Sequence, residues 1–237
     1  MKAPLLTVVI PAFNEEKRIC MTLDKVTRYL KRQPYTWEII VVDDGSLDDT
    51  ARHVKIWAKR SEFNQNVSVH TIPHAGKGWA IKHGMLAATG QYRFMCDADL
   101  AMPISQLSTF LDKVKAGYDI VIGSRELPGA KRFGESTGRH FRGRVFNWLV
   151  RLIAVGGFND TQCGFKCFRA EVAEHLFMVQ KTRGFGFDVE ILYMASKKKL
   201  RILEIPIEWH HQSCSTVRPF LDSFLMLKDA VYVRLRK

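Results

Sequence analysis

Short runs of β-forming residues alternate with segments of helical period through the first half of the chain. The β-forming runs are residues 6–11, 38–43, 67–72, 92–97 and 120–124. Helices are indicated between them by apolar residues at helical spacing, namely Ile19, Leu23, Val26 and Leu30, then Val54 and Trp57, then the segment 81–88. This alternation is typical of βαβ units, which build a parallel sheet covered by helices. The sequence therefore predicts an open α/β fold.

The second half of the chain has a less regular pattern. Residues 126–137 are rich in Gly, Pro and charge, which indicates a mobile loop rather than a domain linker. We expect helices at 144–155 and 188–196, a strand at 202–207 and a last, amphipathic helix. One stripe of that helix, which suits either packing on the protein body or contact with a membrane, holds Phe220, Phe224, Leu227, Val231 and Leu235. The 237 residues fit a single domain.

The chain is basic, with 36 Lys and Arg against 24 Asp and Glu and a formal net charge of +12. Such a charge attracts an anionic partner, whether nucleic acid, an acidic membrane surface or a phosphorylated small molecule. A nucleic-acid-binding module is the alternative of a different class, but no RNA or DNA recognition motif supports it. The 5 cysteines favour free thiols in a reducing compartment. Without a signal-peptide pattern or an apolar run of about 20 residues, we expect a cytoplasmic location.

Acidic residues close two of the predicted strands. Asp43 and Asp44 end the second strand, and Asp97 and Asp99 end the fourth. Ligands of open α/β sheets bind outside the carboxyl ends of the strands, and four carboxylates gathered there require a compensating cation or donors from a ligand. Asp97 and Asp99 offer hard oxygen ligands that suit Mg²⁺ or Mn²⁺ bound together with a substrate diphosphate. An isolated Asp-x-Asp is often only a helix N-cap or a solvated turn, but its position at a strand end favours a metal site.

Two further segments lie where predicted strands meet helices. Residues 11–15 offer free backbone N–H groups and the ring of Phe13, which suit a base or ribose, although Asn14 as a helix N-cap explains them equally well. Residues 76–78, Gly-Lys-Gly, suit a phosphate with the charge of Lys77. They lack the full P-loop pattern, so a plain glycine turn is the alternative.

Seven segments in order along the chain resemble the glycosyltransferases of family 2. They are residues 9–15, 41–46, 76–78, 97–99, 123–125, 160–166 and 187–190. Within that family they most resemble the branch of the dolichyl-phosphate β-glucosyltransferases and dolichol-phosphate mannose synthases. The resemblance implies one GT-A domain over residues 1–237, in which 1–125 bind a nucleotide sugar and 126–237 bind a polyprenyl-phosphate acceptor.

The resemblance also implies roles for individual residues. Donor contacts are implied for Pro11, Ala12, Phe13, Glu15, Asp43, Asp44, Lys77, Asp97 and Ala98. Asp99 corresponds to the main metal ligand, with Asp97 beside it. Contacts to the acceptor phosphate are implied for Arg125, Arg139 and Arg218. The catalytic residues expected on this basis are Asp99, Arg125 and Asp160.

Two departures from the family pattern refine these expectations. Ala101 stands where mannose synthases carry Gln, which favours UDP-glucose over GDP-mannose as the donor. Ser215 and Thr216 replace a Ser-Lys pair of many relatives, which leaves Arg218 as the expected phosphate contact. Because this chain ends at Lys237, where some relatives continue into transmembrane helices, we expect membrane contact to be peripheral, on the cytoplasmic face.

The implied reaction is attack of an acceptor phosphate oxygen on the anomeric carbon, with inversion of configuration. A phosphate monoester with a second pKa of about 6 is ionised near neutral pH, so no strong general base is needed. Asp160, Asp188 and Glu190 then either orient the acceptor or sugar hydroxyls or serve as structural caps. The alternative activities are transfer to a hydroxyl of a glycan or another acceptor, which requires a carboxylate base, and donor binding without turnover.

Overall fold

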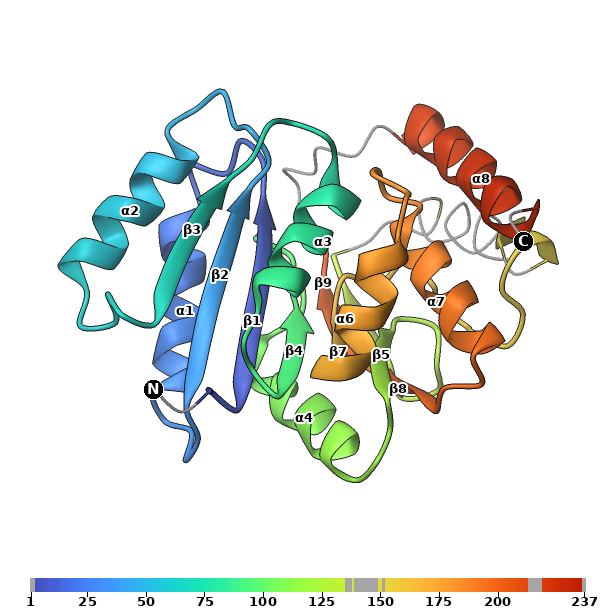
Figure 1. Ribbon diagram of the computed structural model, residues 1–237, viewed down its shortest axis with the longest axis horizontal. Helices are drawn as coiled ribbons and strands as arrows, with labels where there is room; N and C mark the ends of the chain where they lie inside the picture. Colours follow the sequence, from blue (N-terminus) through green and yellow to red (C-terminus); the bar gives the residue numbers. More distant parts are fainter. Residues whose placement is uncertain (1–2, 135–137, 139–148, 151, 213–218, 236–237) are drawn as a thin grey trace.

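A seven-stranded sheet runs through the centre of the molecule in the order β3-β2-β1-β4-β7-β5-β8 (Figure 1). The structure is a computed structural model and describes residues 3–134, 138, 149–150, 152–212 and 219–235. The strands are β1 (Leu6–Ala12), β2 (Trp37–Asp43), β3 (Val67–Thr71), β4 (Tyr92–Met95), β5 (Ile120–Ser124), β7 (Lys166–Arg169) and β8 (Ile202–Pro206). All five strands predicted in the first half, and the one expected at 202–207, are therefore confirmed.

The sheet is mostly parallel, with one exception. β3, β2, β1 and β4 are parallel neighbours and β5 is parallel to β8, but β7 lies antiparallel between β4 and β5. The α/β fold predicted from the sequence is confirmed, but the pattern did not predict the antiparallel strand β7. In register, Ala12 lies opposite Asp43, so β1 and β2 end level at the same edge of the sheet.

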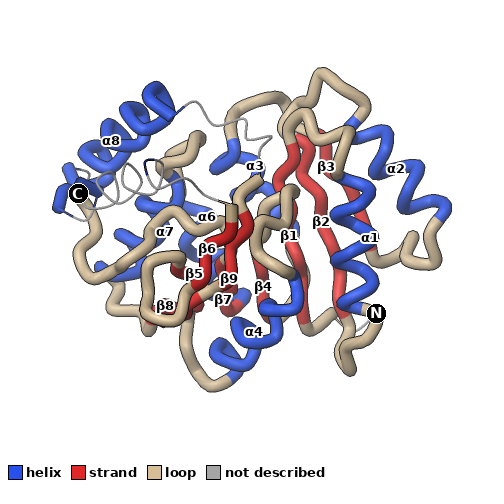
Figure 2. The backbone as a smooth tube through the Cα atoms, turned by 180° about the vertical axis from the view of Figure 1, so that it is seen from behind, coloured by secondary structure: helices blue, strands red, loops and turns tan. Residues whose placement is uncertain are grey.

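Helices cover both faces of the sheet, and each layer has its own apolar core (Figure 2). One layer contains α1 (Ile19–Leu30), α2 (Thr50–Arg60) and α4 (Leu107–Lys115), the last preceded by the short helix η1 (Ile104–Gln106). The other contains α3 (Lys77–Ala87), α6 (Ala170–Val179) and α7 (Phe187–Lys197), with α8 (Pro219–Leu235) packed on α7. Because α1 buries the apolar positions that recur at helical spacing, its amphipathic pattern explains its place in the layer.

The segment expected to be a mobile loop contains a strand. β6 (Lys131–Phe133) pairs in parallel with β9 (Glu208–His210), and the rings of Phe133 and His210 stack with centroids 4.7 Å apart. A three-residue strand is too short to show a period, which is why the pattern did not predict it. Of the helix expected at 144–155, residues 149–150 and 152–153 are helical, and 144–148 and 151 lie outside the described residues. In the part of the chain that the structure describes, no helix has the length and apolar character needed to span a bilayer.

Candidate active site

The loops that follow β1 and β2 are joined by hydrogen bonds. The backbone N–H of Asn14 donates to Ser46 Oγ at 2.9 Å, and the N–H of Leu47 donates to Asn14 Oδ1 at 2.8 Å. Asn14 adopts a positive φ of 56°, a conformation that Asn tolerates better than most residues. It is not the helix N-cap considered from sequence, because α1 begins only at Ile19. The loops therefore bring residues 11–15 next to Asp43, as the proposed donor site requires.

Asp44 organises the loop that leads into α3. Its buried carboxylate accepts hydrogen bonds from the backbone N–H groups of Ala75 and Gly76, both at 2.9 Å, and contacts His74 Nδ1 at 2.9 Å. The His74 ring in turn stacks on Phe13, with centroids 4.3 Å apart. Asp44 thus fixes both the turn before Lys77 and the aromatic ring beside the first loop. Its predicted contact to the donor stays a prediction.

Asp97 and Asp99 lie just beyond β4, together with Lys77 at the start of α3. Lys77 Nζ lies 2.5 Å from Asp97 Oδ1, and the Ala101 N–H donates to Asp99 Oδ1 at 3.0 Å. Burial and the neighbouring charge of Asp97 raise the pKa of Asp99. Burial opposes the charge of Lys77, but Asp97 and then Asp188 outweigh it and raise the Lys77 pKa. Two half-buried carboxylates that repel each other form a site that favours a cation.

The loop before β7 closes around this carboxylate pair. Gly164 packs so tightly on Asp97 that a Cβ at that position would collide with the Asp97 carboxylate. Only glycine permits this approach, which explains why a small residue follows Cys163 in the sequence. The segment 160–166 therefore contributes directly to the shape of the predicted metal site, a role that was not expected for it from the sequence.

Arg125 and Asp160 form a bidentate ion pair just after the end of β5. Arg125 Nε donates to Asp160 Oδ2 at 2.7 Å and its Nη2 donates to Oδ1 at 2.9 Å, while the Arg125 backbone N–H adds a bond of 3.1 Å. Burial alone would raise the pKa of Asp160, but the charge and hydrogen bonds of Arg125 hold it at about 2. Both residues were predicted separately as site residues, and the structure brings them together.

The other predicted acceptor residues, Arg139 and Arg218, lie outside the described residues. The structure adds two groups that the sequence pattern did not indicate, Arg132 and Trp209. The guanidinium carbons of Arg125 and Arg132 lie 5.7 and 6.0 Å from the ring centre of Trp209. Neither Arg132 nor Trp209 belongs to a periodic segment or a recognisable motif, so only the β6–β9 pairing reveals that they meet.

The Glu190 carboxylate binds backbone N–H groups, which fits the structural cap that was one of the two alternatives considered from the sequence. Its carboxylate accepts the N–H groups of Lys181, at 3.0 and 3.1 Å, and of Thr182, at 2.7 Å. These bonds fix the start of the loop between α6 and α7. That loop contacts the start of α3, because the Trp79 N–H donates to the Arg183 carbonyl at 3.0 Å.

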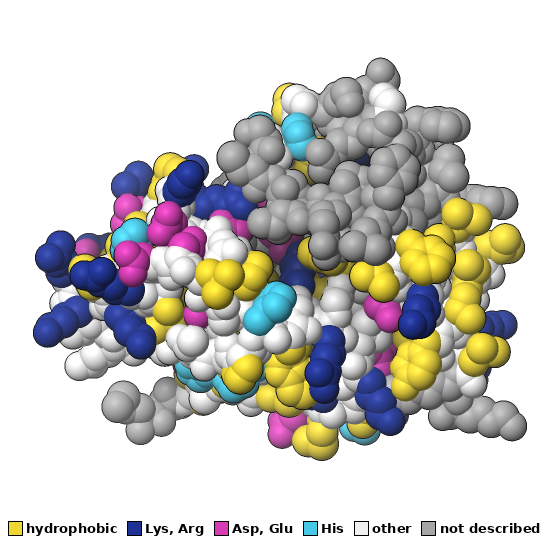
Figure 3. Space-filling view, turned by 90° about the horizontal axis from the view of Figure 1, so that it is seen from above, with side chains coloured by type: hydrophobic (Ala, Val, Ile, Leu, Met, Phe, Trp, Pro, Cys, Tyr) yellow, Lys and Arg dark blue, Asp and Glu magenta, His cyan; other side chains and the backbone are white. Residues whose placement is uncertain are grey.

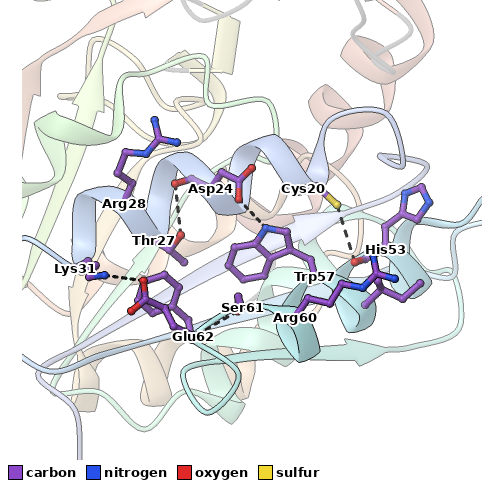
Figure 4. Close-up of a pocket in the computed structure, with 12 residues that line it drawn as sticks. Cys20, Asp24, Thr27, Arg28, Lys31, His53, Trp57, Arg60, Ser61 and Glu62 are labelled. Carbon is purple, nitrogen blue, oxygen red and sulfur yellow. Dashed lines mark hydrogen bonds and ion pairs between the residues drawn. The ribbon is translucent and has the colours of Figure 1, made fainter.

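A hollow on the described surface lies away from these residues. It is a groove of about 640 Å³ between α1 and α2, bridged by a 2.7 Å hydrogen bond from Trp57 Nε1 to Asp24 and by the ion pair of Lys31 with Glu62 (Figure 4). None of the predicted site residues lines it. The candidate site is instead the edge at which β1, β2, β4 and β5 end and α3 begins. In the view from above, acidic and basic side chains lie side by side at the left of the molecule (Figure 3).

Metal-ligating side chains are sparse at this edge. Within the described ranges, no group of three or more His, Cys, Asp or Glu side chains is arranged to hold an ion. Asp97 and Asp99 alone suit an ion whose other ligands are water and substrate phosphates. The expectation of free thiols is confirmed for Cys20, Cys96, Cys163 and Cys167, and Cys214 lies outside the described residues.

A Rossmann-like sheet with an Asp-x-Asp pair, a lysine and an arginine at its carboxyl edge defines a GT-A fold of the nucleotide-sugar-dependent class. Residues 7–177 match the family described as glycosyl transferase family 2. The chain belongs to this family of glycosyltransferases, as its motifs indicated.

Curated relatives cover most of the chain. It is 33% identical to the dolichyl-phosphate beta-glucosyltransferase of Homo sapiens, over 98% of this chain and 75% of that protein. The identity to the protein of the same name from Saccharomyces cerevisiae is 34%, over 97% of this chain and 74% of the relative. A Trichomonas vaginalis dolichyl-phosphate beta-glucosyltransferase is 38% identical over 86% of this chain, which spans 63% of that relative.

Solved structures agree on the fold. Glucosyl-3-phosphoglycerate synthase from Mycobacterium tuberculosis, in complex with Mn²⁺, UDP and glucosyl-3-phosphoglycerate, superposes with a TM-score of 0.72. The match covers 98% of this chain and 80% of that one at 19% identity. At this identity the likeness establishes the GT-A fold alone.

Proposed function

We propose that the chain transfers glucose from UDP-glucose to the phosphate of dolichyl phosphate, with inversion at the anomeric carbon. The curated relatives described above carry the name of this activity. Ala101, which offers no side-chain ligand two residues after Asp99, supports UDP-glucose as the donor rather than GDP-mannose.

The state of the three candidate bases supports a phosphate acceptor over a hydroxyl acceptor. Asp160 pairs with Arg125 and has a pKa of about 2, Asp188 pairs with Lys166 at 2.6 Å, and Glu190 binds backbone N–H groups. Because their oxygens are engaged by groups of the protein, these carboxylates are badly placed to take a proton from a substrate hydroxyl. Transfer to a hydroxyl needs a base, whereas an ionised phosphate does not. This engagement of all three carboxylates is the observation that carries the proposal.

The donor is proposed to occupy the edge formed by the first two loops and the start of α3. Residues 11–15 and Asp43 contact the nucleoside, and Lys77 moves its charge from Asp97 to the diphosphate. A divalent ion held by Asp97 and Asp99 would neutralise the charge that grows on the leaving diphosphate. The repulsion that raises the Asp99 pKa and the hard carboxylate oxygens fit Mg²⁺ or Mn²⁺, and the related fold of the mycobacterial synthase binds Mn²⁺.

Arg125 is proposed to hold the acceptor phosphate. Asp160 fixes its guanidinium through Nε and Nη2, so the planar group is pre-oriented beside the carboxyl edge. Arginine suits this task because it stays charged and presents several N–H donors in a fixed geometry. Arg139 and Arg218 remain predicted contacts to the same phosphate.

A lipid acceptor requires contact with a membrane, for which α8 is the proposed surface. Its inner side is buried through Ala230 and Val233, whereas Phe224 is 68% and Leu235 is 76% exposed. Leu225, Val231 and Tyr232 are also exposed, and apolar side chains gather at the right of Figure 3. Three members of the stripe expected from sequence, Phe224, Val231 and Leu235, thus face outward. We propose peripheral binding through this face, and its position on the cytoplasmic side of a membrane stays a prediction.

Replacing Phe224 and Leu235 together by Ser is expected to weaken vesicle binding at least about tenfold, because each apolar side chain contributes about 1.5 to 3 kcal/mol when fully buried. Sedimentation with phospholipid vesicles measures the change. The matched control replaces Met21 and Leu47, which are 53% and 91% exposed in the other half of the molecule. Equal losses in both double variants would contradict the assignment of α8.

The test of the proposed function is a donor panel of UDP-glucose, GDP-mannose and UDP-GlcNAc, with polyprenyl phosphate and Mn²⁺. Glycolipid is expected from UDP-glucose, and chelation of the metal is expected to stop its formation. A polyprenol without phosphate serves as the control acceptor, because a phosphate-directed site should not use it. Turnover with the free alcohol, or with GDP-mannose alone, would contradict the proposed acceptor or donor.

A further inference from the structure

Lys166 is a fully buried lysine that no step of the proposed reaction uses. Its side chain has no exposed surface, and its Nζ lies 2.6 Å from Asp188 Oδ1. The same ammonium donates to the carbonyl oxygens of Cys163 and, at 3.4 Å, Thr161. An ammonium removed from water destabilises a fold unless it is paired and hydrogen-bonded, so these four groups form one unit.

The register of β7 places this unit between the two halves of the site. Lys166 lies opposite Met95 of β4 on one side and opposite Ile122 of β5 on the other. β4 leads into Asp97 and Asp99, and β5 leads into Arg125. Lys166 therefore occupies the strand that separates the metal ligands from the acceptor arginine.

The loop that Lys166 holds reaches both of these groups. At one end of the segment 160–164, the Asp160 carboxylate accepts two hydrogen bonds from the Arg125 guanidinium. At the other end, Gly164 packs directly against the Asp97 carboxylate. The two carbonyls bound by Lys166 lie between these ends. A shift of the loop would therefore move the Arg125 guanidinium and, at the same time, the backbone against which the Asp97 carboxylate packs.

We propose that Lys166, paired with Asp188, is a positioning residue for glycosyl transfer that sets the distance between the metal carboxylates and the acceptor arginine. This inference rests on the proposed function, because the proposed function assigns Asp97 and Asp99 to the metal and Arg125 to the acceptor phosphate.

The experiment removes both charges of the pair, with Lys166→Met and Asp188→Asn in one protein. A single replacement would leave an unpaired buried charge and lower stability by itself. Two properties are measured besides the melting temperature: the affinity for Mn²⁺ in the presence of UDP, from the electron paramagnetic resonance of free Mn²⁺, and the KM for polyprenyl phosphate. We expect both to weaken by about 10- to 100-fold, the usual effect of losing a partner that orients metal ligands.

Arg93 provides the matched control, because it is a buried cation of β4 outside the site. It is 6% exposed and donates to the Met85 carbonyl at 2.6 Å. Arg93→Met is expected to lower the melting temperature and to leave the Mn²⁺ affinity and the acceptor KM unchanged. If Arg93→Met weakens both as the double variant does, the effect is a general loss of stability and the proposal is overturned.

A folded double variant with the wild-type Mn²⁺ affinity and acceptor KM would also overturn it. Should the double variant not fold, Lys166→Arg keeps the charge but places a larger head group against the carbonyls of residues 161 and 163. Lys166→Arg is expected to weaken the Mn²⁺ affinity and raise the acceptor KM as well. If neither changes, the proposal is contradicted. If the wild-type protein transfers no sugar, the proposed function fails, while the Mn²⁺ affinities still decide whether Lys166 positions the metal carboxylates.

Discussion

Asp99→Ala is expected to lower turnover by about 10²- to 10³-fold, the usual effect of removing a group that stabilises developing charge, while the protein remains folded. Asp99 is half-buried beside Asp97, and both burial and that neighbouring charge raise its pKa. A carboxyl group whose pKa is raised in the fold opposes folding in its charged form. Removing it therefore relieves repulsion, and the free energy of unfolding should stay the same or rise.

The measurement pairs steady-state kinetics at saturating donor with thermal unfolding. Asp112→Ala is the control, because Asp112 is an exposed carboxylate on α4 and should leave both turnover and its dependence on Mn²⁺ unchanged. Full turnover by Asp99→Ala at the wild-type Mn²⁺ concentration would remove Asp99 from the metal site. A loss of turnover accompanied by unfolding would contradict the electrostatic argument instead.

The fold was predictable where the elements are long enough to have a period. β1, β2 and α1 span 7, 7 and 12 residues, and their apolar spacing reveals both their type and the face they bury. β7 has 4 residues, β6 and β9 have 3 each, and none of them supplies more than two positions on one face. Their place in the fold follows from pairing with distant strands, which no local pattern contains.

For the candidate site, the sequence indicates members but not the contacts among them. The rule that ligands bind at the carboxyl ends of strands pointed to Asp43 and Asp97, and the family resemblance pointed to Arg125. The same rule cannot tell which side chains neutralise one another. Asp160 and Lys166 belong to one motif of the sequence, yet they bind different partners, Arg125 and Asp188. Those pairings depend on the antiparallel insertion of β7.

Several carboxylates at the edge of the sheet are paired with cations. A chain of net charge +12 nevertheless gathers carboxylates at one edge of its sheet, and the structure pairs several of them with cations: Lys77 with Asp97, Arg125 with Asp160 and Lys166 with Asp188. The side chains of Lys77 and Arg125 are 21% and 24% exposed, whereas that of Lys166 is fully buried. The two partly exposed cations can therefore reach a substrate phosphate, and the fully buried one cannot.

Arg125→Ala is expected to raise the KM for polyprenyl phosphate about 100-fold and to change the KM for UDP-glucose far less. The proposed donor groups lie at or just after the ends of β1, β2 and β4 and at the start of α3, whereas Arg125 follows β5. A bidentate, charge-assisted contact to phosphate is worth roughly twice a neutral hydrogen bond, and Lys offers the charge without the planar geometry. Arg125→Lys should therefore recover only part of the loss.

Arg125→Ala also leaves Asp160 buried without its partner, which costs about 3 to 5 kcal/mol of stability when a buried pair is broken. The double variant Arg125→Ala with Asp160→Asn separates the two effects. Its melting temperature should return toward that of the wild-type protein, because the unpaired charge is gone, but its acceptor KM should stay high. Recovery of the acceptor KM along with stability would mean that Arg125 acts only through the fold, and equal increases of donor and acceptor KM would exclude it as the acceptor's phosphate contact.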